Sequence, residues 1–422
     1  MNSIDKLLHN IKIPKMVKVE QRFERPIIKN VESELIKKLD AKKVLRKIKK
    51  GQSVAVAVGS RGISNLPLMV KTLISEIKKA GGNPFIVPAM GSHGGATAEG
   101  QKSILIDMGI TENYVGAPIR ATMEVAQVGE SENGLPVFID KYAYEADAIV
   151  IINRIKPHVA FRGKYESGLM KMITIGLGKQ KGADICHELG FGKMAENIPA
   201  IARVALEKTN LIFGVGVLEN AYHETCQIEV LENYEIELIE PELQEKAKKL
   251  SPKLYFDNLD VLIIDEIGKD ISGTGFDTNV VGRYHTPYAS GGPSITRISV
   301  LDITNTSHGN ANGLGIVDFT TRRAFEKFKF DQTYPNSLTS TVPLSVKIPM
   351  VLENDKQAIQ AAIKTCNILD KSSVRMVRIK NTLSLGQIQV SESLLREVEK
   401  NSYQKIVGIP EELKFDKNGN LF

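Results

Sequence analysis

The sequence predicts an α/β protein made of two α/β domains with mostly parallel sheets. Short apolar runs rich in β-branched residues alternate with segments whose apolar residues recur at helical spacing, which is the pattern of successive β–α–β units. Residues 246–258 are charged and include Ser251-Pro252, which suits a domain boundary. We therefore expect one domain over residues 1–255 and a second over residues 256–422, with an active-site cleft between them.

The elements of the first domain follow from its apolar runs. The run SVAVAV at residues 53–58 ends at a glycine and has the composition of a buried strand. A helix is expected next, closed by Gly81-Gly82. Its apolar face would consist of Leu66, Met69, Val70, Leu73, Ile74 and Ile77. Further buried strands are expected at residues 84–87, 146–152 and 211–217.

The second domain repeats this alternation. Strands are expected at residues 261–264, 298–303 and 374–379, and the spacing of apolar residues predicts an amphipathic helix over residues 358–369. Neither an internal repeat nor a low-complexity tract interrupts the pattern.

The composition is that of a globular protein, with 422 residues, 42% hydrophobic and 25% charged. No run of about 18 apolar residues occurs, so we expect no membrane span. The N-terminal residues are too interrupted by charge and Pro14 for a signal peptide. Cys186, Cys226 and Cys366 show no close pairing, which favours a reducing compartment. We expect a cytoplasmic protein.

The basic excess of the chain, +6 overall, is concentrated in residues 37–50, where eight of fourteen residues are Lys or Arg. Such a segment could bind nucleic acid or a membrane surface. Apolar residues such as Leu35, Leu39 and Val44 interleave with the charges, however, which indicates a helix with one buried stripe and one solvated face. No aromatic residue alternates with these lysines to stack on bases, so neither nucleic acid nor membrane is an expected partner.

Three loops that follow expected strands carry cations or imidazoles. Ser60 and Arg61 follow the first strand, His93 lies in a glycine-rich turn after the second, and His158 follows the third. In open α/β sheets, ligands bind at the carboxyl ends of the strands, so these side chains are candidates for one site. The flanking glycines let the backbone approach a ligand closely and leave amides for an anion. The loops match neither a Walker nor a dinucleotide motif.

The stretch of residues 161–187 adds a lysine and a third imidazole. Lys171 lies among apolar neighbours, where it is either a desolvated nucleophile or a lysine that reaches solvent at a sheet edge. His187 follows Cys186, and a metal ion could take either side chain as ligand. Their spacing fits no zinc-finger or HExxH pattern.

In their order along the chain, these motifs resemble the nickel-pincer-nucleotide-dependent lactate racemase family and its 2-hydroxyacid racemase and epimerase relatives. Four pieces resemble the family: Ser60-Arg61, Gly91-Ser92-His93 followed by Ala96-Thr97-Ala98-Glu99, Pro157-His158, and Gly168-Leu169-Met170-Lys171 followed by Ile175-Gly176 and residues 183–187. The resemblance covers most of the chain and is densest over residues 59–187.

The resemblance implies a cofactor, a pyridinium-3,5-bisthiocarboxylic acid mononucleotide that holds nickel. Lys171 would tether it, His187 would complete the nickel site, and Ser60 and Arg61 would contact it. His93 and His158 would act as general acid/bases on either side of the substrate, with Arg61 holding the substrate. Configuration at C2 would then be inverted through a planar 2-oxoacid formed by transient hydride transfer, with one imidazole for each enantiomer.

The sequence departs from the family in two places. The first loop reads Val58-Gly59-Ser60 where the family carries an acidic residue and a threonine. In the second domain, which would complete the substrate site, the loop from Gly268 to Arg283 replaces the family's Gln and Lys. By position, Arg283 is expected to clamp the substrate carboxylate, and Asp277 and Asn279 to contact hydroxyl groups. This favours a hydroxyacid other than lactate. Proteins that synthesise the cofactor are further expected partners.

Two other functions remain open on the residues alone. The first is a zinc- or iron-dependent hydrolase or lyase that uses His93, His158 and His187 as metal ligands. The second is a non-catalytic protein that binds an acidic metabolite through Arg61 and the glycine-rich loops.

Overall fold

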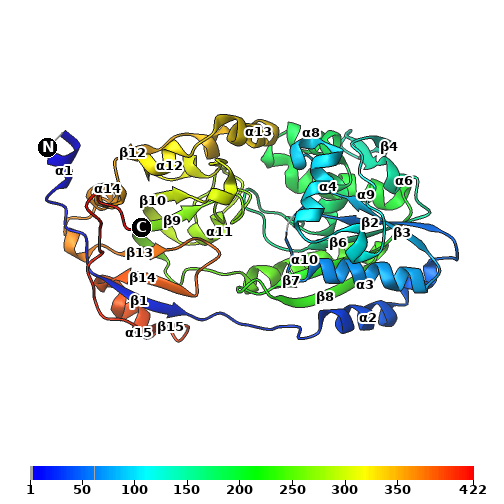
Figure 1. Cartoon of the computed structure of the whole chain (residues 1–422), viewed down its shortest axis with the longest axis horizontal. Coiled ribbons are helices and arrows are strands. Elements are labelled where there is room, and N and C mark those ends of the chain that lie inside the picture. Colours follow the sequence, from blue (N-terminus) through cyan, green and yellow to red (C-terminus); the bar gives the residue numbers. More distant parts are fainter. Residues whose placement is uncertain (1–2, 61) are drawn as a thin grey trace. The chain divides into compact units, whose positions relative to one another are not determined.

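The computed structural model describes residues 3–60 and 62–422, which form two units (Figure 1). Unit 2 comprises Glu24–Ser251, and unit 1 combines Met1–Phe23 with Pro252–Phe422. The division at Ser251 falls inside the charged stretch in which the sequence suggests a boundary. The first 23 residues join the later part of the chain because strand β1 (Met16–Gln21) pairs with two C-terminal strands.

Unit 2 is built on a five-stranded sheet in the order β3-β2-β6-β7-β8. Strands β2, β3, β6 and β7 are parallel, and β8 runs antiparallel to β7. Their bounds are Ser53–Val58 for β2, Asn83–Pro88 for β3, Ala148–Arg154 for β6, Leu211–Glu219 for β7 and Thr225–Glu232 for β8. The expected α/β fold with mostly parallel sheets is confirmed, and the four expected strands of this unit are those of the parallel part.

The helices of unit 2 surround this sheet and a separate hairpin, β4 (Val125–Glu130) with β5 (Pro136–Asp140). The α-helices are α2 (Val31–Lys42), α3 (Leu66–Lys79), α4 (Ala98–Asp107), α5 (Glu112–Val115), α6 (Lys141–Tyr144), α7 (Leu169–Lys171), α8 (Lys179–Glu188), α9 (Met194–Lys208) and α10 (Asn233–Leu250). Shorter 3₁₀ helices are η1 (Val44–Lys47), η2 (Gly94–Ala96) and η4 (Phe191–Lys193), and η3 (Met172–Gly176) is a π-helical turn.

Helix α2 carries the start of the basic segment, and its charges are partly paired rather than simply solvated. The helix ends before Lys43, which adopts a left-handed conformation with φ 55°. Leu35 and Leu39 are buried as expected. The opposite face forms ion pairs with acidic side chains of β8 and α10: Lys38 with Glu229, Lys42 with Glu235, and Lys47 of η1 with Glu232. The acidic partners of this basic segment therefore lie within the same unit.

Unit 1 contains an eight-stranded sheet in the order β12-β11-β10-β9-β13-β14-β1-β15. Its first five strands are parallel, whereas β14, β1 and β15 pair antiparallel. The bounds are β9 (Asn258–Ile267), β10 (Ser294–Ile303), β11 (Phe319–Thr321), β12 (Met350–Leu352), β13 (Met376–Ile379), β14 (Gln387–Ser391) and β15 (Gln404–Ile406).

The α-helices of unit 1 are α1 (Ser3–Leu8), α11 (Thr278–Val281), α12 (Arg322–Glu326), α13 (Phe330–Ser340), α14 (Asp355–Thr365) and α15 (Leu395–Lys400). Its 3₁₀ helices are η5 (Asn305–Ser307), η6 (Leu314–Ile316), η7 (Pro343–Val346), η8 (Lys371–Ser373) and η9 (Glu392–Leu394). The expected helix over residues 358–369 begins three residues earlier and ends at Thr365, and Leu369 is exposed. Over residues 3–60 and 62–422, no helix has both the length and the apolar character needed to cross a membrane.

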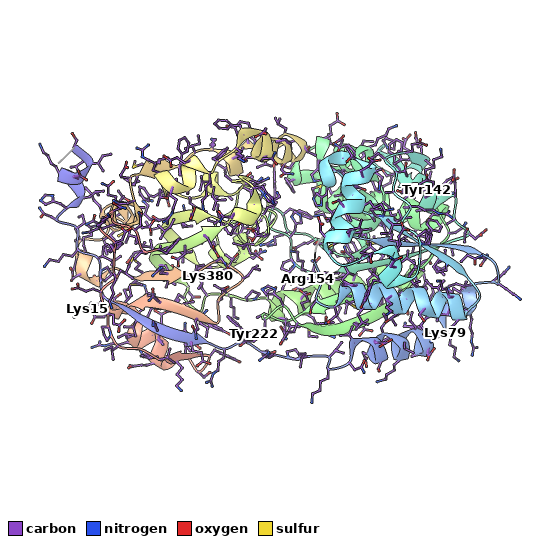
Figure 2. All side chains as sticks on the ribbon, in the orientation of Figure 1. Lys15, Lys79, Tyr142, Arg154, Tyr222 and Lys380 are labelled. Carbon is purple, nitrogen blue, oxygen red and sulfur yellow. The ribbon has the colours of Figure 1, made fainter. Side chains whose placement is uncertain are left out.

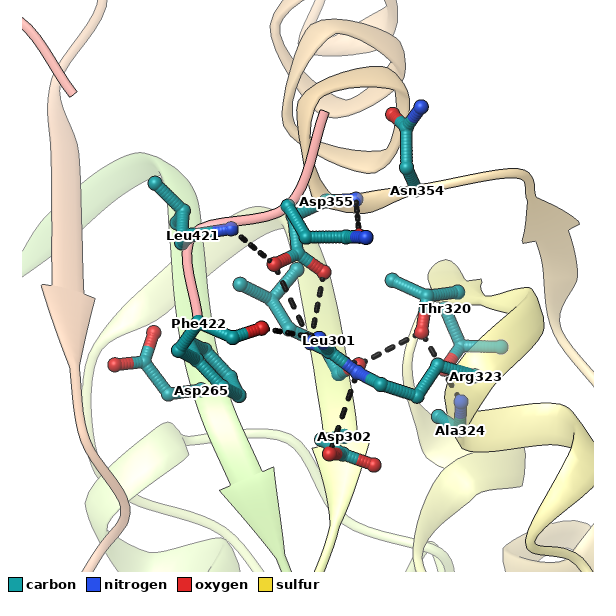
Figure 3. Close-up of polar contacts among 12 residues, drawn as sticks. Asp265, Leu301, Asp302, Thr320, Arg323, Ala324, Asn354, Asp355, Leu421 and Phe422 are labelled. Atoms are coloured by element: carbon teal, nitrogen blue, oxygen red, sulfur yellow. Dashed lines mark hydrogen bonds and ion pairs between the residues drawn. The ribbon is translucent and has the colours of Figure 1, made fainter. Parts of the chain in front are cut away.

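A polar network fixes the last residues of the chain onto unit 1 (Figure 3). Arg323 of α12 donates to the carboxylate of Asp355 and to the carbonyl of Phe422, whose ring lies under the guanidinium. The backbone N–H of Leu421 donates to Asp355 as well. The fully buried Asp355 therefore joins α12, α14 and the C-terminal residues.

The buried strands of unit 2 predict where substitutions will destabilise it. Ile151 of β6 is fully buried, so Ile151→Ala should lower the free energy of unfolding by about 2–5 kcal/mol, through lost burial and the cavity that remains. Leu238 of α10 is 74% exposed, and Leu238→Ala should change it by no more than about 0.5 kcal/mol. Urea unfolding followed by circular dichroism measures both; equal effects would contradict the assigned core.

Candidate active site

The three loops that carry the candidate residues lie at one edge of the unit 2 sheet. Strand β2 pairs in parallel with both β3 and β6, so the carboxyl ends of the three strands are neighbours. Ser60 Oγ, after β2, is hydrogen-bonded to Nδ1 of His93, after β3. A methyl group placed at Gly59 would lie 3.3 Å from Oδ1 of Asn153, near the end of β6. The structure therefore brings the first loop against both of the others.

The segment from Lys171 to His187 runs through α7, the π-helical turn η3 and α8. The π turn is closed by the hydrogen bond from Leu177 N to Met172 O, 2.9 Å long. Such turns are rare and are often found at functional sites. Asn153 Nδ2 donates to the carbonyl of Gly168 at the start of the segment, and Gly91 N donates to the carbonyl of Gly176 within it. Two of the strand-end loops therefore bind this segment through its backbone.

His187 is oriented by a hydrogen bond to its own helix. Its Nδ1 lies 2.7 Å from the carbonyl oxygen of Ala183, which can only accept, so Nδ1 carries the proton and Nε2 presents a lone pair in the neutral ring. Burial lowers the pKa of His187, more than the bond to Ala183 raises it, and the charge of Lys171 lowers the pKa further. A neutral imidazole whose other nitrogen donates to a backbone carbonyl is the usual arrangement of a histidine metal ligand.

Cys186, the other ligand that the sequence leaves open, is less suited to bind metal. Burial raises the pKa of its thiol to about 12, so it remains protonated at neutral pH, while metals bind the thiolate. Its Sγ lies 3.6 Å from Sδ of Met194 in the core. Lys171 is close enough to both Cys186 and His187 for its charge to lower the pKa of each.

His158 is held by its neighbours in the third loop. Its backbone N–H donates to the buried carboxylate of Glu166, and its Nδ1 accepts from the backbone N–H of Ala160 at 3.1 Å. The neutral ring therefore carries its proton on Nε2. The centroid of the Phe191 ring lies 5.9 Å from that of His158 and 5.6 Å from that of His187, so one aromatic side chain contacts both imidazoles.

The His93 loop approaches the same helix. A methyl group at Gly91, where φ is 60°, would lie 3.0 Å from Cγ2 of Ile175 and 3.5 Å from Cβ of Ala183. Ala183 is also the residue whose carbonyl orients His187. Only glycine allows this backbone conformation together with this approach. The loops of His93 and His158 therefore both adjoin the surroundings of His187.

Arg61 lies outside the described residues, and the structure places only what surrounds its loop. Glu219 of β7 accepts a hydrogen bond from Ser64 N, 2.6 Å long, and forms an ion pair with Arg154 at the end of β6. Arg154 is labelled in Figure 2. The buried Glu219 thereby connects the loop after β2 to the ends of β6 and β7.

The three candidates from the second domain lie in unit 1. The guanidinium of Arg283 pairs with Asp318 and donates to the carbonyls of Ile295, Thr296 and Ile316. Asp277 caps α11, and its Oδ1 accepts from both the backbone and the side chain of Asn279. All three side chains thus have contacts within the unit, and their substrate roles stay predictions.

The described residues contain no group of three or more His, Cys, Asp and Glu side chains that could hold a metal ion. His93, His158 and His187 are accordingly not gathered into one such group within residues 3–60 and 62–422.

Two buried glutamates of the site were not expected from the sequence. Glu166 forms ion pairs with Lys248 and Arg162 beside His158. Glu240 Oε2 accepts from the backbone N–H groups of Leu169 and Met170, at 2.8 and 3.0 Å, directly before Lys171. A pattern could have revealed Glu240, because it lies on the buried helical stripe with Ile236, Leu243, Gln244 and Ala247.

Glu240 predicts a pH dependence of stability. Burial raises its pKa from 4.5 to about 7, so between these values the folded state keeps a proton that the unfolded state has lost. Rising pH therefore lowers the stability of the wild type across this window, by up to about 1.4 kcal/mol per pH unit, and has no further effect through this group above pH 7. Glu240→Gln should lose this slope, as urea unfolding at successive pH values can measure; parallel profiles would contradict it.

Comparison with known proteins agrees with the resemblance found in the motifs. The family described as lactate racemase N-terminal domain matches residues 6–197. Among solved structures, the lactate racemase apoprotein from Thermoanaerobacterium thermosaccharolyticum is similar with a TM-score of 0.53, covering 88% of this chain and 99% of that chain at 14% sequence identity. At this identity the structural likeness shows the fold alone. No curated protein matches the chain. The match over residues 6–197 agrees with the resemblance to the lactate racemase family that the motifs show.

Proposed function

We propose that this protein is an isomerase, a racemase or epimerase that inverts configuration at C2 of a 2-hydroxyacid with a bound nickel-pincer nucleotide. One observation carries the proposal. The loops of His93 and His158 adjoin the segment that contains Lys171 and His187, and the loop of Ser60 is hydrogen-bonded to His93. The match of residues 6–197 to the lactate racemase N-terminal domain family supports racemase activity in general.

The residues of this segment fit the cofactor. His187 would bind nickel through Nε2, because its Nδ1 donates to Ala183, and imidazole is a suitable ligand for Ni(II). Lys171 would attach the cofactor, close enough to His187 for their charges to interact. Ser60 and Arg61 would contact its remaining groups. When bound, the cofactor supplies a reversible hydride acceptor.

The two other histidines would handle the hydroxyl proton of the substrate. The Cα proton beside a carboxylate is very weakly acidic, so direct abstraction is difficult, whereas the hydroxyl proton can pass to a neutral imidazole. His93 is suited to accept it, since the hydroxyl of Ser60 can either donate to Nδ1 or accept from it. His158 is set to hold a proton on Nε2, because Ala160 occupies its Nδ1. The pair would therefore provide a base, His93, and an acid, His158. His158 would donate from Nε2 as the imidazolium, in which a second proton on Nδ1 replaces the contact with Ala160.

The substrate itself would be bound through its carboxylate, by Arg61 and by Arg283 of unit 1, with Asp277 and Asn279 near its hydroxyl groups. We propose a hydroxyacid different from or larger than lactate, because the loop from Gly268 to Arg283 departs from the family pattern. We also propose that the protein is cytoplasmic and that biosynthetic proteins supply its cofactor.

Loss of either catalytic imidazole should abolish turnover. His93→Ala and His158→Ala should each lower kcat by about 10²–10⁴-fold, the usual contribution of a general acid/base. His9→Ala is the matched control, because His9 is exposed in the N-terminal residues. Protein from a host that makes the cofactor is incubated with a panel of 2-hydroxyacids in D₂O, and the products are separated by chiral chromatography. Retention of the Cα hydrogen is expected; full activity of both variants would remove their assigned roles.

The metal and the tether can be tested separately. Protein from the same host should contain about one nickel per chain, as the single-cofactor proposal requires, and should show a mass increase that maps to Lys171. His187→Ala should lose nickel, whereas Cys186→Ser should retain it, because the buried thiol stays protonated. Lys171→Ala should lose the mass increase. Metal analysis and intact-protein mass spectrometry give both answers; zinc or iron without an adduct would refute the cofactor assignment.

A further inference from the structure

A lysine that the proposed reaction does not use is fully buried in unit 2. Lys179, at the start of α8, has no exposed surface. Its Nζ donates to the carbonyl of Pro88 at 2.8 Å and to Oε1 of Gln101 at 2.6 Å, and lies 3.2 Å from Oδ2 of Asp140. Two of its N–H donors therefore make hydrogen bonds, and the carboxylate of Asp140 adds an ion pair. Lys179 is therefore buried between two hydrogen-bond acceptors and one carboxylate.

Gln101 of α4 continues this network to the His93 loop. It is also fully buried, and its Nε2 donates to the carbonyls of Gly91 and His93, at 2.8 and 3.2 Å. A side-chain amide can point either way, but Oε1 must face the ammonium of Lys179, so Nε2 must face the loop. Lys179 thereby determines which atom of Gln101 meets the backbone of His93.

The network connects the elements that hold the proposed reacting groups. Lys179 begins the helix that contains His187, Pro88 ends the strand that precedes the His93 loop, and Gln101 binds that loop at two carbonyls. Asp140 balances the buried charge and caps α6 through the backbone N–H of Ala143. Without the Nε2 donor of Gln101, the carbonyls of Gly91 and His93 would lose this hydrogen-bond partner. Other contacts would still hold the elements on either side of the loop.

We propose that Gln101 and Lys179 are positioning residues for His93: Gln101 fixes the His93 loop, and Lys179 acts through Gln101 by orienting its amide. Their contribution to catalysis rests on the proposed function, whereas their hold on the His93 loop does not. Both side chains are fully buried, and Gln101 contacts the loop at its backbone carbonyls, so the proposal assigns neither a contact with the substrate. A displacement of a reacting group by about 1 Å can cost about 10²-fold in rate.

The sharpest test is Gln101→Glu, which keeps the size and the acceptor for Lys179 but places a carboxylate oxygen against the carbonyls of Gly91 and His93. The new charge pair with Lys179 preserves the anchor, so the protein should remain folded while the loop is displaced. In the apoprotein, ¹⁵N-histidine NMR should show altered His93 ring signals and unaltered signals of His285 and His308 in unit 1. In the loaded enzyme, kcat should fall by about 10²-fold with a smaller change in KM.

Two further variants test the same proposal in case Gln101→Glu does not fold. Gln101→Met removes both polar contacts at similar size. Lys179→Met combined with Asp140→Asn removes both buried charges together and frees the Gln101 amide to turn. Both should alter the His93 ring signals in the same way.

The matched control is Gln21→Glu in unit 1. Gln21 is buried, and its Nε2 also donates to two carbonyls, those of Leu385 and Lys253. This variant should leave the His93 signals and kcat unchanged. Folded Gln101 variants with wild-type His93 signals would overturn the proposal, as would failure of all three variants to fold. If the wild type has no racemase activity, the proposed function fails, and the NMR result alone decides the positioning role.

Discussion

The candidate site depends on the parallel alignment of β2, β3 and β6, because this alignment alone brings Ser60, His93 and His158 to one edge of a sheet. Each of these residues follows a buried strand, and none would meet the others in an antiparallel arrangement. The segment from Lys171 to His187 is then held at this edge by two hydrogen bonds: the side-chain amide of Asn153 donates to the carbonyl of Gly168, just before the segment, and the backbone N–H of Gly91 donates to the carbonyl of Gly176.

Buried ionisable side chains lie beside this arrangement, and their contacts explain why unit 2 tolerates them. Glu240 accepts hydrogen bonds from two backbone N–H groups at the start of α7, and Glu166 accepts one from the backbone N–H of His158. Lys179 donates to Gln101 and so orients its side chain. Each charge costs solvation, so each is a poor choice for stability alone. Each, however, binds backbone or side-chain groups next to a residue of the proposed reaction. Groups held in this way need little reorganisation when charge develops on a substrate, which is the main source of electrostatic catalysis.

Patterns among neighbouring residues predicted the single strands and the loops after them, because these elements are determined locally. The strands at residues 53–58 and 211–217 were expected because buried parallel strands are continuous apolar runs, and the loops after them could be located for the same reason. The pairing of β1 with β14 and β15 could not be expected, since it joins residues nearly four hundred positions apart by backbone hydrogen bonds. The network of Lys179 and Gln101 was missed because a buried lysine looks like a surface lysine in a sequence. For Arg61, which lies outside the described residues, only the anchoring of its loop by Glu219 is seen.

His93 and His158, the two proposed acid/bases, differ in the hydrogen bond that each makes through Nδ1. A racemase must run in both directions, so each imidazole has to accept a proton in one direction and donate it in the other. Ser60 can serve His93 in both states, because a hydroxyl both donates and accepts. The Ala160 amide can only donate, and it bonds to His158 only while Nδ1 is unprotonated. When His158 acts as the base through Nε2, its Nδ1 must carry the proton and the contact with Ala160 must open. As the acid, His158 must be the imidazolium, which also carries a proton on Nδ1. The contact between His158 and Ala160 therefore has to open in both directions, whereas the bond between Ser60 and His93 can persist in both.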